Sequence, residues 1–361
     1  MKDYFKQQPI INRLIKDKFA LGGLIVLAVL YLGITFASFI APYSKDFSDR
    51  HLSYAPPSKI YTIDTQGRLS WPYTYNYVRK FNPNTFSMEF RQDRSKKYYL
   101  RFFSEGFKYK FLGLIPTNIH LFTVEKSGKL FLLGSDINGR DNFSRLLYGG
   151  QISLTIGFLA LFISFPIGML YGGIAGYFGG KIDNIMMRIA EAIMSIPSFY
   201  LLISLAAILP ANMTSSQRFT LITIILAFIG WAGFSRVIRG MVLSIKNQEF
   251  VEASKALGSG SFRIIVKHIL PQTASYVIVA MTLSVPGYIL AESGLSFLGL
   301  GIQQPDASWG NMLKEAQEYV NIIHRPWLLT PGLLIFIAVL AFNLVGDTVR
   351  DILDPKSKIR E

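Results

Sequence analysis

The most regular chemical spacing in the chain lies in a polar stretch, residues 249–272, between two long apolar segments. Charged side chains recur there at every third position, at Glu249, Glu252 and Lys255. Small and apolar residues keep helical spacing on the other side, at Phe250, Ala253, Ala256 and Leu257. This pattern predicts a short amphipathic helix. Taken alone, it is also typical of an ordinary helix-turn-helix in a polar loop.

The residues that follow predict how this helix ends. Gly258 comes just after the last periodic residue, where a glycine adopts a left-handed conformation without steric cost. A second helix is expected to begin near Ser261. Pro271 is then expected in the first turn of the next apolar segment, where its missing N–H needs no partner.

Motifs for catalysis or for binding nucleotides and metals are missing. The sequence has no cysteine, no His-Glu-x-x-His and no Gly-x-Ser-x-Gly. Gly179-Gly180-Lys181 fails as a phosphate-binding loop, because Ala175 replaces the first glycine and Ile182 the required Ser or Thr. Asp136 and Asp141 have no further acid or histidine nearby to complete a metal site. We therefore expect no cofactor and no enzymatic activity, and any nucleotide energy must come from another chain.

The complete spacing resembles the signature of the permease subunits of ABC importers, Glu-Ala-Ala, three residues, Gly, nine residues, Ile-x-Leu-Pro. Glu252, Ala253, Gly258, Leu270 and Pro271 match it, while Ser254 and His268 depart from it. Histidine at that position is similar to the dipeptide and oligopeptide (peptide/nickel) branch. The resemblance covers roughly residues 133–355 and the first apolar run. It implies that the loop, Glu249 included, docks on a separate ATPase.

The same resemblance implies a set of partners. These are a second, homologous permease subunit, giving a heterodimeric pore, two ABC ATPase subunits and an extracytoplasmic substrate-binding protein. Short peptides are the implied cargo, although relatives also carry nickel complexes, glutathione and other small solutes.

Half of the residues are hydrophobic, and they occur in runs long enough to cross a bilayer. We predict an all-α polytopic membrane protein with six transmembrane helices, similar to a type I ABC importer permease, and a small β-rich extracytoplasmic insertion. The first run lacks an evident cleavage site, so we expect it to remain as an anchor. The predicted spans are 19–40, 152–178, 185–209, 219–234, 273–290 and 327–345.

The distribution of Lys and Arg predicts the orientation of these spans. Seventeen basic residues lie in the arm, loops and tail on one side, whereas the two short loops on the other side hold only Arg218, Lys314 and Arg325. Both termini and the loop 249–272 are therefore expected in the cytoplasm. An outer domain without disulfides suits a bacterial envelope, and we expect the chain in the cytoplasmic (inner) membrane. Membrane lipids are expected partners, and nucleic acid is not.

The segment 42–132 is expected to form the outer β-rich insertion. Alternating aromatics at Tyr73, Tyr75 and Tyr77, and again at Phe107, Tyr109 and Phe111, indicate strands. The stretch 121–133 predicts a hairpin around Ser127-Gly128. Between Pro42 and Gly150 there are 17 basic residues and 9 acids, which favours a solvated basic surface near anionic lipid heads over an anionic ligand site.

Two polar stretches flank the spans on the outer side. Residues 136–145 predict a turn and a short helix at the membrane face, with the acids and Ser144 as caps and Arg140 and Arg145 at the water boundary. The second stretch predicts one amphipathic helix lying on the outer interface, from residues at helical spacing: Trp309, Met312, Leu313, Ala316, Val320 and Ile323.

Two acids lie at the ends of predicted spans, Glu191 near the cytoplasmic start of the third and Glu292 near the outer end of the fifth. An ionisable group at such a depth lines a pathway or has an interfacial structural role, and the sequence leaves both readings open.

The chain is accordingly divided into five parts. They are a cytoplasmic N-terminal arm (1–18), a first transmembrane helix (19–41), the insertion (42–132), a five-helix permease core (133–350) that contains the coupling loop 241–272, and a cytoplasmic tail (351–361). The main alternative function is a gradient-driven carrier or channel, which would place charges or broken helices near the midplane. A membrane-embedded enzyme ranks last.

Overall fold

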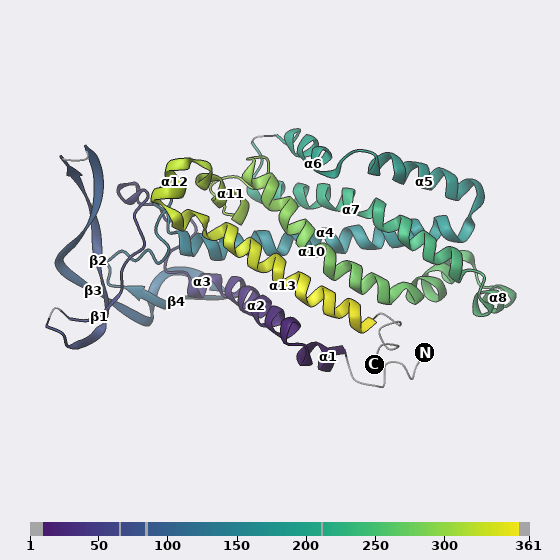
Figure 1. Cartoon of the computed structure of the whole chain (residues 1–361), viewed down its shortest axis with the longest axis horizontal. Helices are drawn as coiled ribbons and strands as arrows, with labels where there is room; N and C mark the ends of the chain where they lie inside the picture. Colours follow the sequence, from purple (N-terminus) through teal and green to yellow (C-terminus); the bar gives the residue numbers. More distant parts are fainter. Residues whose placement is uncertain (1–9, 65, 84–85, 211, 354–361) are drawn as a thin grey trace. The chain divides into compact units, whose positions relative to one another are not determined.

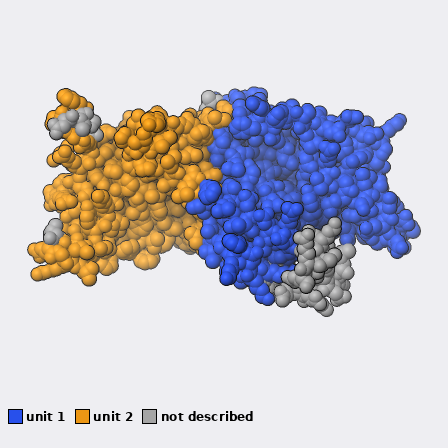
Figure 2. Space-filling view, in the orientation of Figure 1, with its two compact units in different colours: residues 1–27, 154–295, 336–361 blue, residues 28–153, 296–335 orange. Residues whose placement is uncertain are grey.

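A computed structural model describes residues 10–64, 66–83, 86–210 and 212–353, without the side chains of residues 10–12, 87 and 88. Parts of the predicted arm (1–9) and tail (354–361) therefore lie outside the described residues. The chain forms two compact units (Figure 2). Unit 1 consists of residues 1–27, 154–295 and 336–361, and unit 2 of residues 28–153 and 296–335.

Long apolar helices dominate the described chain (Figure 1). Five of them are long and apolar enough to cross a membrane, and a bent pair would make a sixth span. The N-terminal helices are α1 (Ile10–Lys16), α2 (Lys18–Thr35) and α3 (Ala37–Ile40). The other long helices are α4 (Asn142–Phe178), α7 (Ser215–Ile245), α10 (Ala274–Phe297) and α13 (Thr330–Leu353).

Small residues let α4 and α7 approach closely within unit 1. A side chain at Gly172 would clash with the carbonyl oxygen of Ser235, and one at Gly176 would clash with Val242. In an apolar solvent, where the hydrophobic effect does not drive helices together, such close contact provides much of the packing energy. These glycines therefore fix the α4–α7 contact.

The predicted third span is not a continuous helix. Residues 180–207 form α5 (Gly180–Met194) and α6 (Ser198–Ala207), which are bent by 78° relative to each other (Figure 1). Pro197 lies at the break, where it lacks an N–H to donate and disfavours a helical conformation of the residue before it. The prediction of a single helix over 185–209 is therefore wrong.

Unit 2 contains an antiparallel sheet whose four described strands follow chain order. The strands are β1 (Tyr61–Ile63), β2 (Leu69–Asn82), β3 (Ser87–Phe111) and β4 (Ile115–Val124). A single turn of 3₁₀ helix, η1 (Arg50–Leu52), precedes them. Tyr73 and Tyr75 are buried, and their rings meet edge to face, as the alternation of aromatics predicted.

The hairpin predicted around Ser127-Gly128 is wrong. Gly128 closes a turn through its N–H to the carbonyl oxygen of Glu125, but the described residues after β4 form no further strand. The observed hairpin joins β3 to β4 through Leu112–Leu114, with Gly113 at φ +76°. Gly113 was the available sequence signal for this turn.

The outer stretch 309–329 is also more broken than predicted. It forms α11 (Trp309–Leu313), η4 (Lys314–Gln317), α12 (Tyr319–His324) and η5 (Pro326–Leu329). Trp309, Met312 and Ala316 are buried as expected, but Val320 and Ile323 are exposed and the amide of Asn321 is buried instead. Because the helix breaks at Glu318, the helical phase shifts and the second half of the predicted apolar face is lost.

Candidate functional site

The loop 241–272 of unit 1 contains the predicted short helix. Helix α8 runs over Glu249–Ala256 and α9 over Ser261–Ile264. Gly258 has φ +77° and donates its N–H to the carbonyl oxygen of Lys255 (2.9 Å), while the N–H of Ser259 reaches that of Ser254 (3.1 Å). These two bonds form a Schellman end, which satisfies carbonyls that the last helical turn leaves free. The predicted role of Gly258 and the start at Ser261 are confirmed.

One side of helix α8 is buried and the other side is exposed. Val251 and Ser254 are buried, whereas Glu249, Glu252 and Ala253 are exposed. Large apolar side chains are exposed beside the acids, with Leu257 at 86% and Phe262 at 65% of their full exposure. An exposed surface that combines acids, a small residue and large apolar groups is typical of a contact site for another protein.

The second half of the loop is anchored. Residue Ile265 begins a π turn, η2 (Ile265–Ile269), followed by a 3₁₀ turn, η3 (Leu270–Thr273), in which Pro271 occupies the first turn as predicted. A Cβ added at Gly173 of α4 would touch both Ile265 and Leu270 at about 3.1–3.2 Å. His268 is half-buried between these anchors. The loop therefore packs directly on α4.

Two lysines tie the loop to the end of α4. The ammonium of Lys246 donates to the carbonyl oxygens of Gly176 (3.0 Å) and Tyr177 (3.4 Å), which the helix end leaves free. Lys255 of α8 lies over the ring of Tyr177, 5.5 Å from its centre. Displacement of α8 would therefore pull on α4.

A bidentate ion pair joins α5 to α7 in the same unit. The guanidinium of Arg239 donates from Nε and Nη2 to the two carboxylate oxygens of Asp183, at 2.5 Å each. Asp183 is buried and Arg239 is half-buried. The paired geometry fixes the angle between two helices as well as their separation. This pair was not predicted, because the partners are 56 residues apart.

A cavity of about 510 Å³ lies among α4, α6, α7 and α10. Its lining is apolar apart from hydroxyl groups, and it contains no Asp, Glu, His, Lys or Arg. The hydroxyls belong to Ser198, Tyr276, Ser284 and Tyr288. Such a lining has no charged group that would favour an anion or a cation.

The two candidate ionisable residues lie apart from this cavity. Glu191 is exposed on α5 and pairs with Arg188 at 3.4 Å. Glu292 is fully buried in α10, where the hydroxyl of Ser293 lies 3.4 Å from its carboxylate. Neither residue lines the cavity.

Comparison with known proteins identifies the chain. A family model described as the binding-protein-dependent transport system inner membrane component matches residues 164–359, more than half of the chain. The chain belongs to this family. A model of the N-terminal TM domain of oligopeptide transport permease C matches residues 8–57 of this permease.

Several curated relatives of the permease are similar over 62% of its length. The dipeptide transport system permease protein DppC of Bacillus subtilis is 47% identical over 223 residues, 68% of that relative. The oligopeptide transport system permease protein OppC of Haemophilus influenzae is 43% identical over 226 residues, 70% of its length. The glutathione transport system permease protein GsiD of Escherichia coli is 41% identical, over 72% of its length. The resemblance to ABC importer permeases is confirmed.

Among solved structures, the permease is similar to a chain of the MetNI methionine ABC transporter in inward-facing conformations. The TM-score is 0.44 at 22% identity, and the match covers 58% of this chain and 96% of that chain.

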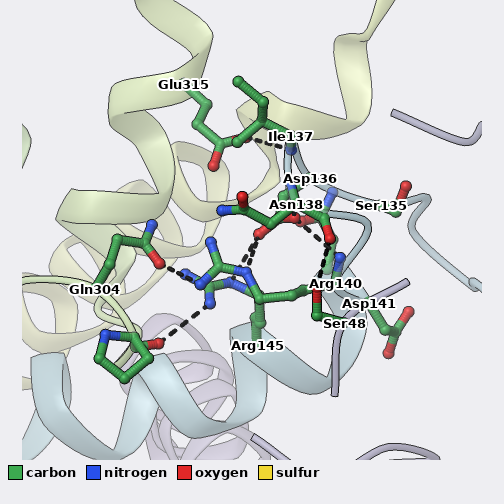
Figure 3. Close-up of polar contacts among 12 residues, drawn as sticks. Ser48, Ser135, Asp136, Ile137, Asn138, Arg140, Asp141, Arg145, Gln304 and Glu315 are labelled. Atoms are coloured by element: carbon green, nitrogen blue, oxygen red, sulfur yellow. Dashed lines mark hydrogen bonds and ion pairs between the residues drawn. The ribbon is translucent and has the colours of Figure 1, made fainter. Parts of the chain in front are cut away.

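In unit 2 the permease buries a charged cluster at the start of α4 (Figure 3). The Nε of Arg140 donates to Oδ2 of Asp136 at 2.6 Å, and Nε of Arg145 lies 3.5 Å from the same oxygen. Gln304 accepts from Arg140, and the carboxylate of Glu315 accepts from the N–H of Ile137. The exposures of Arg140 and Arg145 are only 7% and 4%. The prediction that both arginines stay at the water boundary is wrong.

The helix in this region is also longer than expected. α4 begins at Asn142 and continues without a break to Phe178, so the separate short helix predicted after the turn at Asp136 is wrong. Asp141 caps its first turn as predicted, since Oδ2 accepts from the N–H and the hydroxyl of Ser144 at 2.8 and 2.6 Å. The arginines pack inward because the carboxylate of Asp136, the side-chain oxygen of Gln304 and the carbonyl oxygen of Pro305 accept from them there (Figure 3).

Two carboxyl groups around the cluster are expected to make the stability of unit 2 depend on pH. Burial raises the pKa of Asp141 to about 7, and burial, aided by the charge of Asp136, raises the pKa of Glu315 to about 7. In the unfolded chain both ionise near pH 4, so the folded state holds more protons between about pH 4 and 7. Stability therefore falls as pH rises through this window and levels off above it.

The test is thermal unfolding of the purified permease between pH 4.5 and 8. The unfolding temperature is expected to fall by several degrees across this range, and the double variant Asp141→Asn, Glu315→Gln should remove most of that slope. Glu105→Gln, at an exposed carboxyl, is the control and should keep the slope. An unchanged slope in the double variant would show that other groups cause it.

Proposed function

We propose that this permease moves short peptides or similar small solutes across the cytoplasmic membrane, with energy from separate ATPase subunits. Dipeptide, oligopeptide and glutathione permeases among its relatives support this class of cargo. The cavity, which is apolar apart from four hydroxyl groups, has no charged side chain, so it is compatible with solutes that carry both an ammonium and a carboxylate. A gradient-driven carrier is the alternative.

The proposed assembly has both termini and the loop 241–272 in the cytoplasm. It contains a second homologous permease subunit, two ABC ATPases and an extracytoplasmic substrate-binding protein. The excess of Lys and Arg on the loop side supports this orientation. The segment 42–132 is then an extracytoplasmic insertion and 133–350 the transporting core. We assign Glu191 and Glu292 to structural roles, since neither lines the cavity.

The observation that carries the proposal is the construction of α8. Its exposed side offers Glu249, Glu252 and Ala253 to an ATPase, and its other side is fixed by Val251 and Ser254. The residues that follow, from Gly258 to Pro271, hold this helix against α4 through Ile265 and Leu270. Closure of the ATPases would therefore move α8 and α4 together and change the access to the cavity.

The test is reconstitution into proteoliposomes with a panel of labelled dipeptides. The permease alone should give no accumulation, and addition of its second permease, ATPases and binding protein should give accumulation that requires ATP. Accumulation by the chain alone, driven by an ion gradient, would support the alternative carrier and overturn the proposal.

A further inference from the structure

The turn between β3 and β4 exposes apolar side chains that the fold does not use. Leu112, Leu114 and Ile115 are 54%, 81% and 63% exposed. The turn itself is well formed, since the N–H of Gly113 reaches the carbonyl oxygen of Lys110 and the N–H of Leu114 that of Phe111. Three large apolar side chains within four residues of a hairpin tip have no role in the core of unit 2 and need another apolar surface.

Aromatic contacts place this turn beside the end of the first span. Along β3, Phe103 lies 6.2 Å from Phe39 of α3, ring centre to ring centre. Eight residues later Phe111 meets both Phe39 (6.3 Å) and Phe36 (5.7 Å). Since Phe36 is nearer to α2 than Phe39, the strand runs back along the helix toward α2 (Figure 1). The turn at Leu112 therefore lies level with the C-terminal end of α2 or beyond it.

That end of α2 marks a membrane face. Helix α2 has 18 residues from Lys18 to Thr35, is apolar enough to cross a bilayer and is about 27 Å long at 1.5 Å per residue. The hydrocarbon core is about 30 Å thick, so Thr35 lies close to its boundary. Leu112 and Leu114 would therefore lie at the boundary between the lipid headgroups and the hydrocarbon core.

A cleft separates the turn from the helices. It has a volume of about 200 Å³ and is lined by Phe36 and Leu112 together with polar groups of Ser38, Tyr109, Lys110 and Gln151. Lys110 is exposed and forms none of the ion pairs found in the described part of the chain. An apolar wall with one free ammonium at a membrane boundary fits a phospholipid. The phosphate of the lipid would lie at the ammonium of Lys110, and its acyl chain would lie along Leu112.

We propose that the β3–β4 turn inserts into the membrane face where α2 ends, and that the cleft beneath it holds the headgroup of an anionic phospholipid against Lys110. The insertion is thereby fixed to the bilayer. Continuity with the apolar surface of α2 favours lipid over a protein partner. This proposal holds for either orientation of the chain, so it does not depend on the proposed cargo or ATPases.

Insertion is tested with fluorescent probes in liposomes. The chain contains no cysteine, so single cysteines at Leu114→Cys and Phe86→Cys can carry an environment-sensitive dye. Phe86 is the matched control, because it is 84% exposed but lies at the opposite end of β3. Lipids with a quencher near the headgroup should quench the probe at 114 several-fold more than the probe at 86, and aqueous iodide should do the reverse.

Quenching of the 114 probe by iodide as strong as that at 86 would place the turn in water. Protection from both quenchers would place it against protein, in a second copy or a partner. Either result would overturn the proposal.

Headgroup binding is tested by native mass spectrometry of the permease purified with anionic phospholipid. Lys110→Glu is expected to lose one retained lipid relative to wild type, whereas Lys126→Glu, at an exposed lysine of the following loop, should lose none. Equal lipid retention in the two variants would overturn the assignment of the cleft to a lipid headgroup.

Discussion

Glu252→Arg is expected to abolish solute uptake while leaving the permease folded and in the membrane. Glu252 is exposed on α8 and makes none of the ion pairs found among the described residues, so its loss costs the fold little. If α8 docks on a basic surface of an ATPase, the substitution places like charges together at the contact. Such a juxtaposition costs several kcal/mol, which corresponds to a loss of affinity of roughly 100-fold or more.

Uptake of labelled peptide and co-purification of the ATPases measure this effect. Both are expected to fall together, and Glu252→Gln should give an intermediate loss because it removes the attraction without adding repulsion. Asp351→Arg is the matched control, since it reverses another exposed acid, near the end of α13. Normal uptake in Glu252→Arg would refute docking through α8, and an equal loss in Asp351→Arg would show that net charge matters rather than the contact.

The conformation of the loop 249–272 could be predicted because the residues that determine it act on their near neighbours in the sequence. The spacing of Glu249, Glu252 and Lys255, the glycine at 258 and the proline at 271 each act within a few residues of where they stand. Local hydrogen bonds of a helix end and the conformational freedom of glycine are enough to determine such a segment. Tertiary contacts then add the anchor on α4 without changing it.

The charged cluster of unit 2 could not be predicted in the same way. Arg140 and Gln304 are 164 residues apart, and no periodicity in the sequence connects them. An arginine before an apolar run is ordinarily assigned to the membrane surface, because burial of its charge is costly without partners. Only the fold, by bringing Gln304 and Glu315 to Asp136, makes burial of the two arginines acceptable.

The break in the third span also has a local signal in the sequence, although the composition of the segment is that of a continuous helix. Residues 185–209 have the composition of one apolar helix, but Ser195 and Pro197 interrupt it. Proline disfavours the helical conformation of the preceding residue, so composition predicted the segment and missed its 78° bend. The bend separates α5, which carries Asp183 for the pair with Arg239, from α6, which lines the cavity.

Asp136→Ala is expected to be the most destabilising single change in unit 2. Its Oδ1 accepts the N–H groups of Asn138 (2.8 Å) and Arg140 (2.9 Å), and its Oδ2 faces the side chains of Arg140 and Arg145. Without this carboxylate two buried guanidinium groups lose their nearest compensating charge. Breaking a buried pair from one side typically costs about 3–5 kcal/mol, which lowers the unfolding temperature by roughly 10 °C or more.

Two comparisons separate the buried charge from a general loss of contacts. Glu125→Ala removes a pair with Arg101, whose side chain is 64% exposed, and it should cost no more than about 1 kcal/mol. Asp136→Ala combined with Arg145→Met removes one of the stranded charges, so this double variant should be more stable than Asp136→Ala alone. If the two losses simply add, the cost comes from packing and hydrogen bonds, and the cluster does not depend on charge balance.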